Sequence, residues 1–182
     1  DPVIIRVGSC GALQPDIAVG DAVISTSAVR LESTSLGFVE EGYPAHAHHE
    51  AILALVSAAA DLGVSHHVGV TAAAAGFYGL QGRSGNAIEP RFPDMPERLA
   101  KQGVLNLEME TSTLFTLATL ARVRAGAVCA VFANRPANAF IAADDKHSAE
   151  DRAISVGLRA LEYLDAMDAK GRPFVLDAPQ GG

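Results

Sequence analysis

Seven consecutive residues, FYGLQGR from Phe77 to Arg83, place an aromatic pair, an amide and a guanidinium in one loop jointed by glycines. The ring of Phe77 offers a packing face, Gln81 offers one acceptor and two donors, and Arg83 offers a rigid fork of donors. This set suits a flat polar heterocycle such as uracil, whose edge carries an N–H donor between two carbonyl oxygens. A surface loop with an exposed Arg and a buried Phe accounts for the same residues.

A glycine-rich stretch, Gly8 to Gly11, follows the apolar residues at the start of the chain. We expect a tight turn there, with backbone N–H groups that face an anion. Arg6 and the hydroxyl of Ser9 would lie beside this turn, and together they predict a phosphate site. The alternative is that Gly8 and Gly11 only let strands cross closely, while Arg6 pairs with a carboxylate.

Two carboxylates stand two residues apart in the segment NLEMETSTL, where a predicted strand gives way to a helix. Side chains at i and i+2 of an extended segment share a face, so Glu108 and Glu110 could line one pocket with Met109. A carboxylate in that pocket could accept hydrogen bonds from both hydroxyls of a ribose. The alternative is a helix start whose acidic residues favour the helix dipole.

These segments resemble the nucleoside phosphorylase superfamily, and within it the uridine phosphorylases. Four pieces carry the resemblance in chain order: IIRVGSCGALQPDIAVGDAVI, HHVGVTAAAAGFYGLQGR, GVLNLEMETSTL and AGAVCAVFANR. The purine branch of that superfamily has an Asp near the start of the late loop, which donates a proton to the base. This chain reads VFANRPANAF there and has Arg135 with no acid, so the resemblance favours a pyrimidine.

The resemblance implies an enzyme, a pentosyltransferase that cleaves uridine reversibly with phosphate to give uracil and ribose 1-phosphate. Phosphate is then a co-substrate, and neither a cofactor nor a metal ion is implied. Gln81 and Arg83 would hold the edge of the uracil while Phe77 packs on its ring. Arg135 would stabilise the negative charge that reaches the base in the transition state.

The family roles on the sugar and the phosphate fall on six residues: Glu108, Met109 and Glu110 for the ribose, and Arg6, Gly8 and Ser9 for the phosphate. Glu110 would orient the ribose hydroxyls, and Arg6 would hold the phosphate at attack distance. The family usually has Thr where this chain has Ser9, and the hydroxyl is retained. Arg6, Glu110 and Arg135 are the residues that the resemblance assigns to catalysis.

Members of the family have earlier strands, which supply a glycine turn, further phosphate arginines and a histidine that reaches a neighbouring subunit. Since Asp1 and Pro2 open directly onto the strand of Arg6, we expect an N-terminally incomplete phosphorylase domain over residues 1–182. The resemblance also implies a cytoplasmic homo-oligomer, either a dimer or a hexamer built as a trimer of dimers. Two other functions stay open, a hydrolase similar to AMP nucleosidase and a non-catalytic truncated homologue that binds nucleosides.

Composition limits the classes of function. With 182 residues, 49% of them hydrophobic and 19% charged, the chain suits one globular domain with a substantial core. Its net charge of -7 argues against a nucleic-acid surface, so the expected ligands are small. Cys10 and Cys129 lack a C-x-x-C spacing, and no signal peptide or membrane-spanning run is recognisable, which favours a reduced cytoplasmic setting.

Strands and helices alternate along the chain, which predicts an α/β fold with a sheet covered by helices. The resemblance adds that the central sheet is mixed and that its N-terminal strands are lacking. Strands are predicted at Val3–Val7, Ala22–Arg30, His67–Ala72, Val104–Leu107 and Ala125–Ala133. Helices are predicted at His48–Leu62, Thr111–Arg122 and Ala149–Asp168.

The last helix has the clearest predicted start, with Ser148 as its N-cap and Asp151 three residues on. Its apolar positions recur at helical spacing: Ile154, Leu158, Leu161 and Leu164. Long loops are predicted at 79–96 and 134–146, where they could cover a site, and a loose tail is predicted at 170–182.

Two polar clusters have plain structural explanations. His46, His48 and His49 could be drawn as a metal site, but no further ligand completes a known spacing, and a solvated helix start is the favoured interpretation. The acidic run at 143–147 could attract a cation, yet a solvated loop before Ser148 is favoured there. The sequence therefore predicts no metal site.

Overall fold

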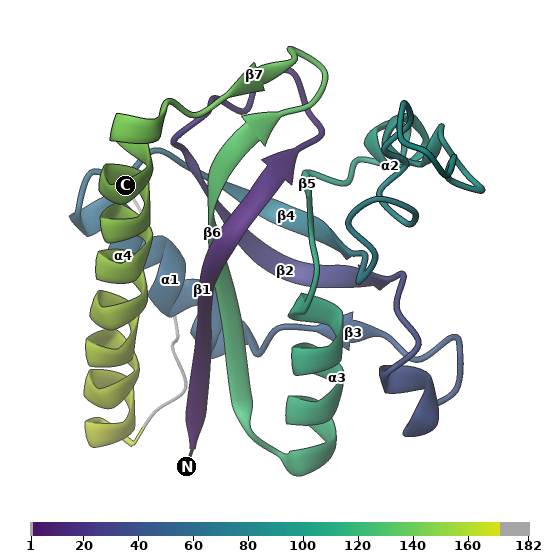
Figure 1. Cartoon of the computed structure of the whole chain (residues 1–182). Coiled ribbons are helices and arrows are strands. Elements are labelled where there is room, and N and C mark those ends of the chain that lie inside the picture. Colours follow the sequence, from purple (N-terminus) through teal and green to yellow (C-terminus); the bar gives the residue numbers. More distant parts are fainter. Residues whose placement is uncertain (1, 172–182) are drawn as a thin grey trace, which may run out of the picture.

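The computed structural model of the chain describes residues 2–171 and contains a mixed β-sheet with helices on both faces (Figure 1). Within these residues the sheet has seven strands in the order β3-β2-β4-β5-β1-β6-β7, and β2 also pairs with β6. The strands are β1 (Val3–Ala12), β2 (Ala22–Arg30), β3 (Ala45–His46), β4 (His66–Ala73), β5 (Asn106–Glu108), β6 (Arg124–Asn134) and β7 (Ala139–Phe140). The predicted α/β fold with a mixed, helix-flanked sheet is confirmed.

Successive residues of β6 face opposite layers of helices, as the alternation of a strand requires. Ala127 packs in one cluster with Phe115 of α3 (Thr111–Ala121). The next residue, Val128, packs in another cluster with Val156 of α4 (Ala143–Ala169) and with α1 (His49–Asp61). Every residue of β6 from Arg124 to Val131 is buried, which is typical of a strand covered on both faces.

Strand β1 carries three of the predicted phosphate-site residues, Arg6, Gly8 and Ser9. It pairs in parallel with β6 along its whole length, with a register shift after Cys10. Its last two residues, Gly11 and Ala12, pair antiparallel with β5, which lies parallel to β4. A buried hydrogen bond of 2.8 Å from the hydroxyl of Thr71 in β4 to Oδ1 of Asn106 holds β5 in place. The ends of β1 and β5 are therefore fixed beside each other.

Helix α4 begins earlier than the sequence predicts. Its first residue is Ala143, so the predicted N-cap at Ser148 is wrong, and the segment 143–147 is helical instead of forming a solvated loop. Asp144 and Asp145 lie in the first turn, where negative charge favours the positive end of the helix dipole. The charges that suggested a loop are thus the ones that suit a helix start.

The buried face of α4 also differs from the one that the apolar spacing predicts. Of the four recurring apolar positions only Leu164 is buried. The three exposed positions are Ile154, Leu158 and Leu161. Small residues face the sheet instead, and a Cβ atom at Gly157 would lie 2.7 Å from a methyl carbon of Val7 in β1. Close contact between the helix and the strand requires small residues there, and it leaves the larger side chains outside.

The other predicted strands and helices lie near their predicted positions, although β1 continues to Ala12. The sequence missed the short elements: η1 (Ser35–Gly37), β3, α2 (Met95–Lys101) at the end of the first long loop, and β7 inside the second. The predicted tail, 170–182, falls almost wholly outside the described residues. Among the described helices, none is long and apolar enough to cross a membrane.

The packing of α4 predicts unequal effects for two leucines of the same helix. Leu164→Ala should lower the free energy of unfolding by about 2–5 kcal/mol, because it empties a site that is 1% exposed. Leu158→Ala is the matched control; at 61% exposure it should change stability by less than about 0.5 kcal/mol. Urea unfolding of both variants measures the difference, and similar losses would contradict the observed packing.

Candidate active site

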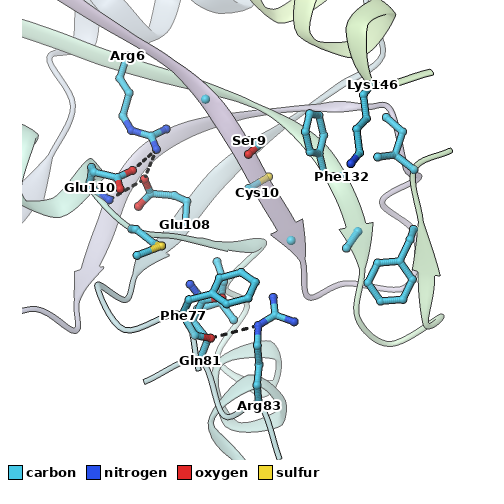
Figure 2. Close-up of a pocket in the computed structure, with 17 residues that line it drawn as sticks. Arg6, Ser9, Cys10, Phe77, Gln81, Arg83, Glu108, Glu110, Phe132 and Lys146 are labelled. Atoms are coloured by element: carbon cyan, nitrogen blue, oxygen red, sulfur yellow. Dashed lines mark hydrogen bonds and ion pairs between the residues drawn. The ribbon is translucent and has the colours of Figure 1, made fainter. Parts of the chain in front are cut away.

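A cavity of about 600 Å³ opens where the ends of β1, β5 and β6 meet the loop that follows β4 (Figure 2). Most of the predicted site residues line it: Arg6, Gly8, Ser9, Phe77, Gln81, Arg83, Glu108, Met109 and Glu110. The fold therefore joins three segments that are far apart in the sequence, and it brings the predicted base, sugar and phosphate groups to one place.

Gly8 to Gly11 do not form the predicted turn. They continue β1, where Gly8 lies opposite Cys129 of β6, so this stretch is held extended by pairing with a distant segment. The absence of a side chain at Gly8 has a different use. A Cβ atom there would lie 2.3 Å from Nη1 of Arg6, so glycine leaves the space that the guanidinium occupies.

Three neighbours hold the guanidinium of Arg6 in the cavity. Its Nη2 lies 3.1 Å from Oε2 of Glu108 and forms an ion pair with Glu110, and its Nη1 donates to Sγ of Cys129 at 2.9 Å. Burial lowers the pKa of Arg6, but the Cys129 thiol and the two carboxylates outweigh burial and raise the pKa overall. The alternative interpretation, in which Arg6 pairs with a carboxylate, is confirmed, and its contact with phosphate stays a prediction.

The two carboxylates lie in different environments. The side chain of Glu108 is 1% exposed, and it accepts hydrogen bonds from the backbone N–H groups of Glu110, at 3.0 Å, and Thr111, at 3.0 and 3.1 Å. Glu108 therefore caps the start of α3, as the helix-start interpretation proposed for one of the two. The side chain of Glu110 is 61% exposed and can reach a ligand.

The loop from Phe77 to Arg83 forms the opposite wall and is braced by its own side chains. Nε of Arg83 donates to the main-chain oxygen of Phe77 at 3.1 Å, and its guanidinium carbon lies 3.9 Å from the centre of the Phe77 ring. Gln81 is 4% exposed, and its Nε2 donates to the main-chain oxygen of Ala74 at 3.3 Å. An aromatic face, an amide and a guanidinium share one wall, as the sequence predicts.

Arg135 lies behind this loop, outside the residues that line the cavity. Its Nη1 donates to the main-chain oxygen of Gln81 at 2.8 Å. Burial, and then the positive charge of Arg83, lower the pKa of Arg135. The structure thus connects Arg135 to the loop that carries Gln81, and a direct contact with a base stays a prediction.

Sequence reasoning missed several residues of the wall, among them Phe132, Phe140, Ile141 and Lys146. Phe132 belongs to a strand that reads as core, and Phe140 lies in the short strand β7 that was not predicted. Lys146 was assigned to a solvated loop, but it lies near the start of α4 and reaches the cavity (Figure 2). Its acidic neighbours suggested solvent, so the sequence offered no signal for it.

A second cavity, of about 510 Å³, lies at the other end of β6 and contains His46, His48 and His49. The rings of His48 and His49 stack with their centres 4.5 Å apart, and burial lowers the pKa of His48. Arg124 in the same cavity is paired with two carboxylates, at 2.9 and 2.6 Å. Over residues 2–171, no group of three or more His, Cys, Asp or Glu side chains is placed to hold a metal ion.

The chain is similar to known phosphorylases over most of its length. The model of the Phosphorylase superfamily matches residues 2–164. A uridine phosphorylase of Thermococcus kodakarensis is 50% identical over 147 residues, which cover 80% of this chain and 53% of that relative. A uridine phosphorylase of Escherichia coli is 38% identical over 164 residues, 88% of this chain and 64% of the relative.

A more distant relative belongs to the purine branch. The DeoD-type purine nucleoside phosphorylase of Roseobacter denitrificans is 33% identical over 158 residues, 86% of this chain and 63% of that protein. This chain therefore spans between 53% and 64% of the length of these three relatives.

The space beside Arg6 predicts a position-specific effect of adding one methyl group to β1. Gly8→Ala should displace the guanidinium and leave the buried Glu108 without its cation, lowering the free energy of unfolding by about 1–3 kcal/mol. Gly11→Ala is the control in the same strand, since the nearest atom to its Cβ would be 3.9 Å away. Equal losses for both variants in urea unfolding would show that Arg6 does not need this space.

Proposed function

Because this chain belongs to the phosphorylase superfamily, we propose that it cleaves uridine reversibly with inorganic phosphate, giving uracil and ribose 1-phosphate. One observation carries the proposal. A single cavity joins the amide and guanidinium of Gln81 and Arg83 to the ion pair of Arg6 and Glu110. The chain covers only part of its relatives, so the activity of the whole protein is part of the proposal.

At the base end, charge develops as the glycosidic bond stretches. The sugar gains oxocarbenium character and the base gains negative charge. Gln81 is buried and held by the Ala74 carbonyl, so its amide is already oriented when a base arrives. Arg83 adds a fixed positive charge on the same wall, and Arg135 adds a second one behind it. Oriented donors and charges of this kind stabilise the leaving base more than the bound substrate.

At the sugar end, Glu110 is the carboxylate that can accept from the ribose hydroxyls. Its carboxylate is exposed to the cavity, whereas the carboxylate of Glu108 already accepts hydrogen bonds from the backbone at the start of α3. Glu108 has a positioning role, because its hydrogen bonds to the backbone of Glu110 and Thr111 orient the turn that carries Glu110 and Met109. Met109 lies beside them in the cavity wall, where the sugar can pack against it.

At the phosphate end, Arg6 and the hydroxyl of Ser9 would hold the nucleophile. The guanidinium keeps its charge because Cys129 and the two carboxylates raise its pKa despite burial. Holding phosphate next to the anomeric carbon replaces a collision in solution by a positioned attack. We assign no cofactor and no metal ion to this reaction, and phosphate is the co-substrate.

The same proposal covers setting and assembly. We assign the protein to the cytoplasm and expect a homo-oligomer, a dimer or a hexamer made as a trimer of dimers. Small molecules are its expected partners, because the net charge of -7 does not suit a nucleic-acid surface. We treat residues 1–182 as one phosphorylase domain.

The decisive experiment measures uracil released from uridine with and without inorganic phosphate. Release that requires phosphate supports the proposal, and release without it supports a hydrolase. AMP is assayed as the substrate of a nucleotide hydrolase, and inosine as the substrate of a purine phosphorylase. A second sample, in which residues of this chain replace the 147 matching residues of the Thermococcus relative, tests the same site within a longer chain. Binding without turnover in both samples supports the non-catalytic alternative.

For the base site, Gln81→Ala should lower kcat/KM for uridine, which corresponds to a rise in activation free energy on the order of 2–4 kcal/mol. The variant removes oriented donors and leaves the edge of the base unpaired. Gln102→Ala is the control, because Gln102 lies on the surface after α2. Steady-state kinetics on both variants give the comparison. Unchanged kinetics for Gln81→Ala would remove this residue from the base site.

For the sugar site, Glu110→Gln keeps the shape of the side chain but replaces a charged double acceptor by an amide. Turnover of uridine should fall more than turnover of 2′-deoxyuridine, because the deoxy sugar lacks one of the two hydroxyl donors. The ratio of kcat/KM for the two nucleosides measures this effect. Glu41→Gln, an exposed loop variant, should leave the ratio unchanged, and an equal loss for both sugars in Glu110→Gln would argue against the contact.

A further inference from the structure

The three guanidiniums around the cavity already have partners in the protein. Arg6 is shared by Glu108, Glu110 and Cys129. Arg83 lies on the ring of Phe77 and donates to its carbonyl. Arg135 donates to the carbonyl of Gln81. Of the three, Arg6 is the one already paired with anions, so it must share its carboxylate partners before it can serve an incoming anion.

Lys146 differs from all three. Its side chain lines the cavity near the start of α4, and within the described residues it makes no ion pair, hydrogen bond or cation–π contact. Asp145 beside it lines a different hollow, together with Ser148 and Arg152. Figure 2 shows the side chain of Lys146 directed toward the cavity, which Phe132, Ser9 and Arg6 also line.

Lys146 determines the net charge of the cavity wall. Arg6, Arg83 and Lys146 are the cations that line the cavity, and Glu108 and Glu110 are the anions. The wall therefore carries one excess positive charge, and it would be neutral without Lys146. Phe132, Phe140 and Ile141 line the same cavity, so Lys146 is the charged group among these apolar neighbours.

We propose that Lys146 binds the phosphate co-substrate in the cavity that it lines together with Arg6 and Ser9. This inference rests on the proposed phosphorolysis and adds a residue to the phosphate site. Arg6 supplies a rigid fork that two carboxylates already occupy, whereas the ammonium of Lys146 is a mobile point charge on a flexible stem. Lys146 can therefore meet a phosphate oxygen without breaking an existing interaction.

The first test measures the dissociation constant of inorganic phosphate for the 182-residue chain by isothermal titration calorimetry. Lys146→Gln should weaken phosphate binding by about five- to tenfold, and Lys146→Arg should recover most of the loss. Lys101→Gln, at an exposed site on α2, is the matched control and should bind as the unchanged chain does. Uridine binding should be the same in all four proteins.

Four results would overturn the assignment: no phosphate binding by the unchanged chain, less than a twofold change in Lys146→Gln, an equal change in Lys101→Gln, or a loss that falls on uridine instead. Where uracil release is measurable, Lys146→Gln should raise the KM for phosphate and leave the KM for uridine in place. Failure of the proposed function is a separate outcome. A chain that binds phosphate through Lys146 but does not cleave uridine retains this inference and loses the proposed reaction.

Discussion

The ion pairs of Arg6 are the constraint on which the site depends. A guanidinium taken out of water needs partners, and Arg6 finds them on a segment more than a hundred residues away in the sequence, at Glu108 and Glu110. Glu108 also caps α3, so one buried carboxylate joins β1 to the start of a helix. Gly8 makes this possible because a side chain there would occupy the position of the guanidinium.

The sequence predicted well those elements whose cause is local. The longer strands and the helices α1 and α3 lie near their predicted positions. In these elements the spacing of apolar residues along the sequence directly reflects which side chains are buried. The predicted turn after Arg6 was wrong because glycines suggest a turn locally, whereas pairing with β6 keeps Gly8 to Gly11 extended. The face of α4 was misjudged for a similar reason, since only the close approach of Val7 explains why a glycine lies inside and Leu158 outside.

Residue type and spacing predicted which residues line the cavity better than they predicted the contacts between those residues. Gln81, Arg83 and Glu110 could be chosen from their chemistry, and all three line the cavity. The support of the loop by Arg135 could not be predicted, because it depends on how two distant loops fold against each other. Lys146 was missed because its acidic neighbours suggested solvent, and its place in the wall became clear only with the start of α4.

The pairing of Arg6 with Glu110 also bears on how the proposed substrates would influence each other. In the proposed reaction the phosphate would use Arg6 and the ribose would use Glu110, and in the structure these two side chains form an ion pair with each other. A phosphate that takes a share of the guanidinium weakens its hold on Glu110, and a ribose that engages Glu110 weakens the competing partner of Arg6. Under the proposed assignment each substrate would remove part of the cost of binding the other, and by thermodynamic linkage the two effects would be equal. Glu108 keeps Arg6 in place throughout, because its other hydrogen bonds are to the backbone and do not depend on either substrate.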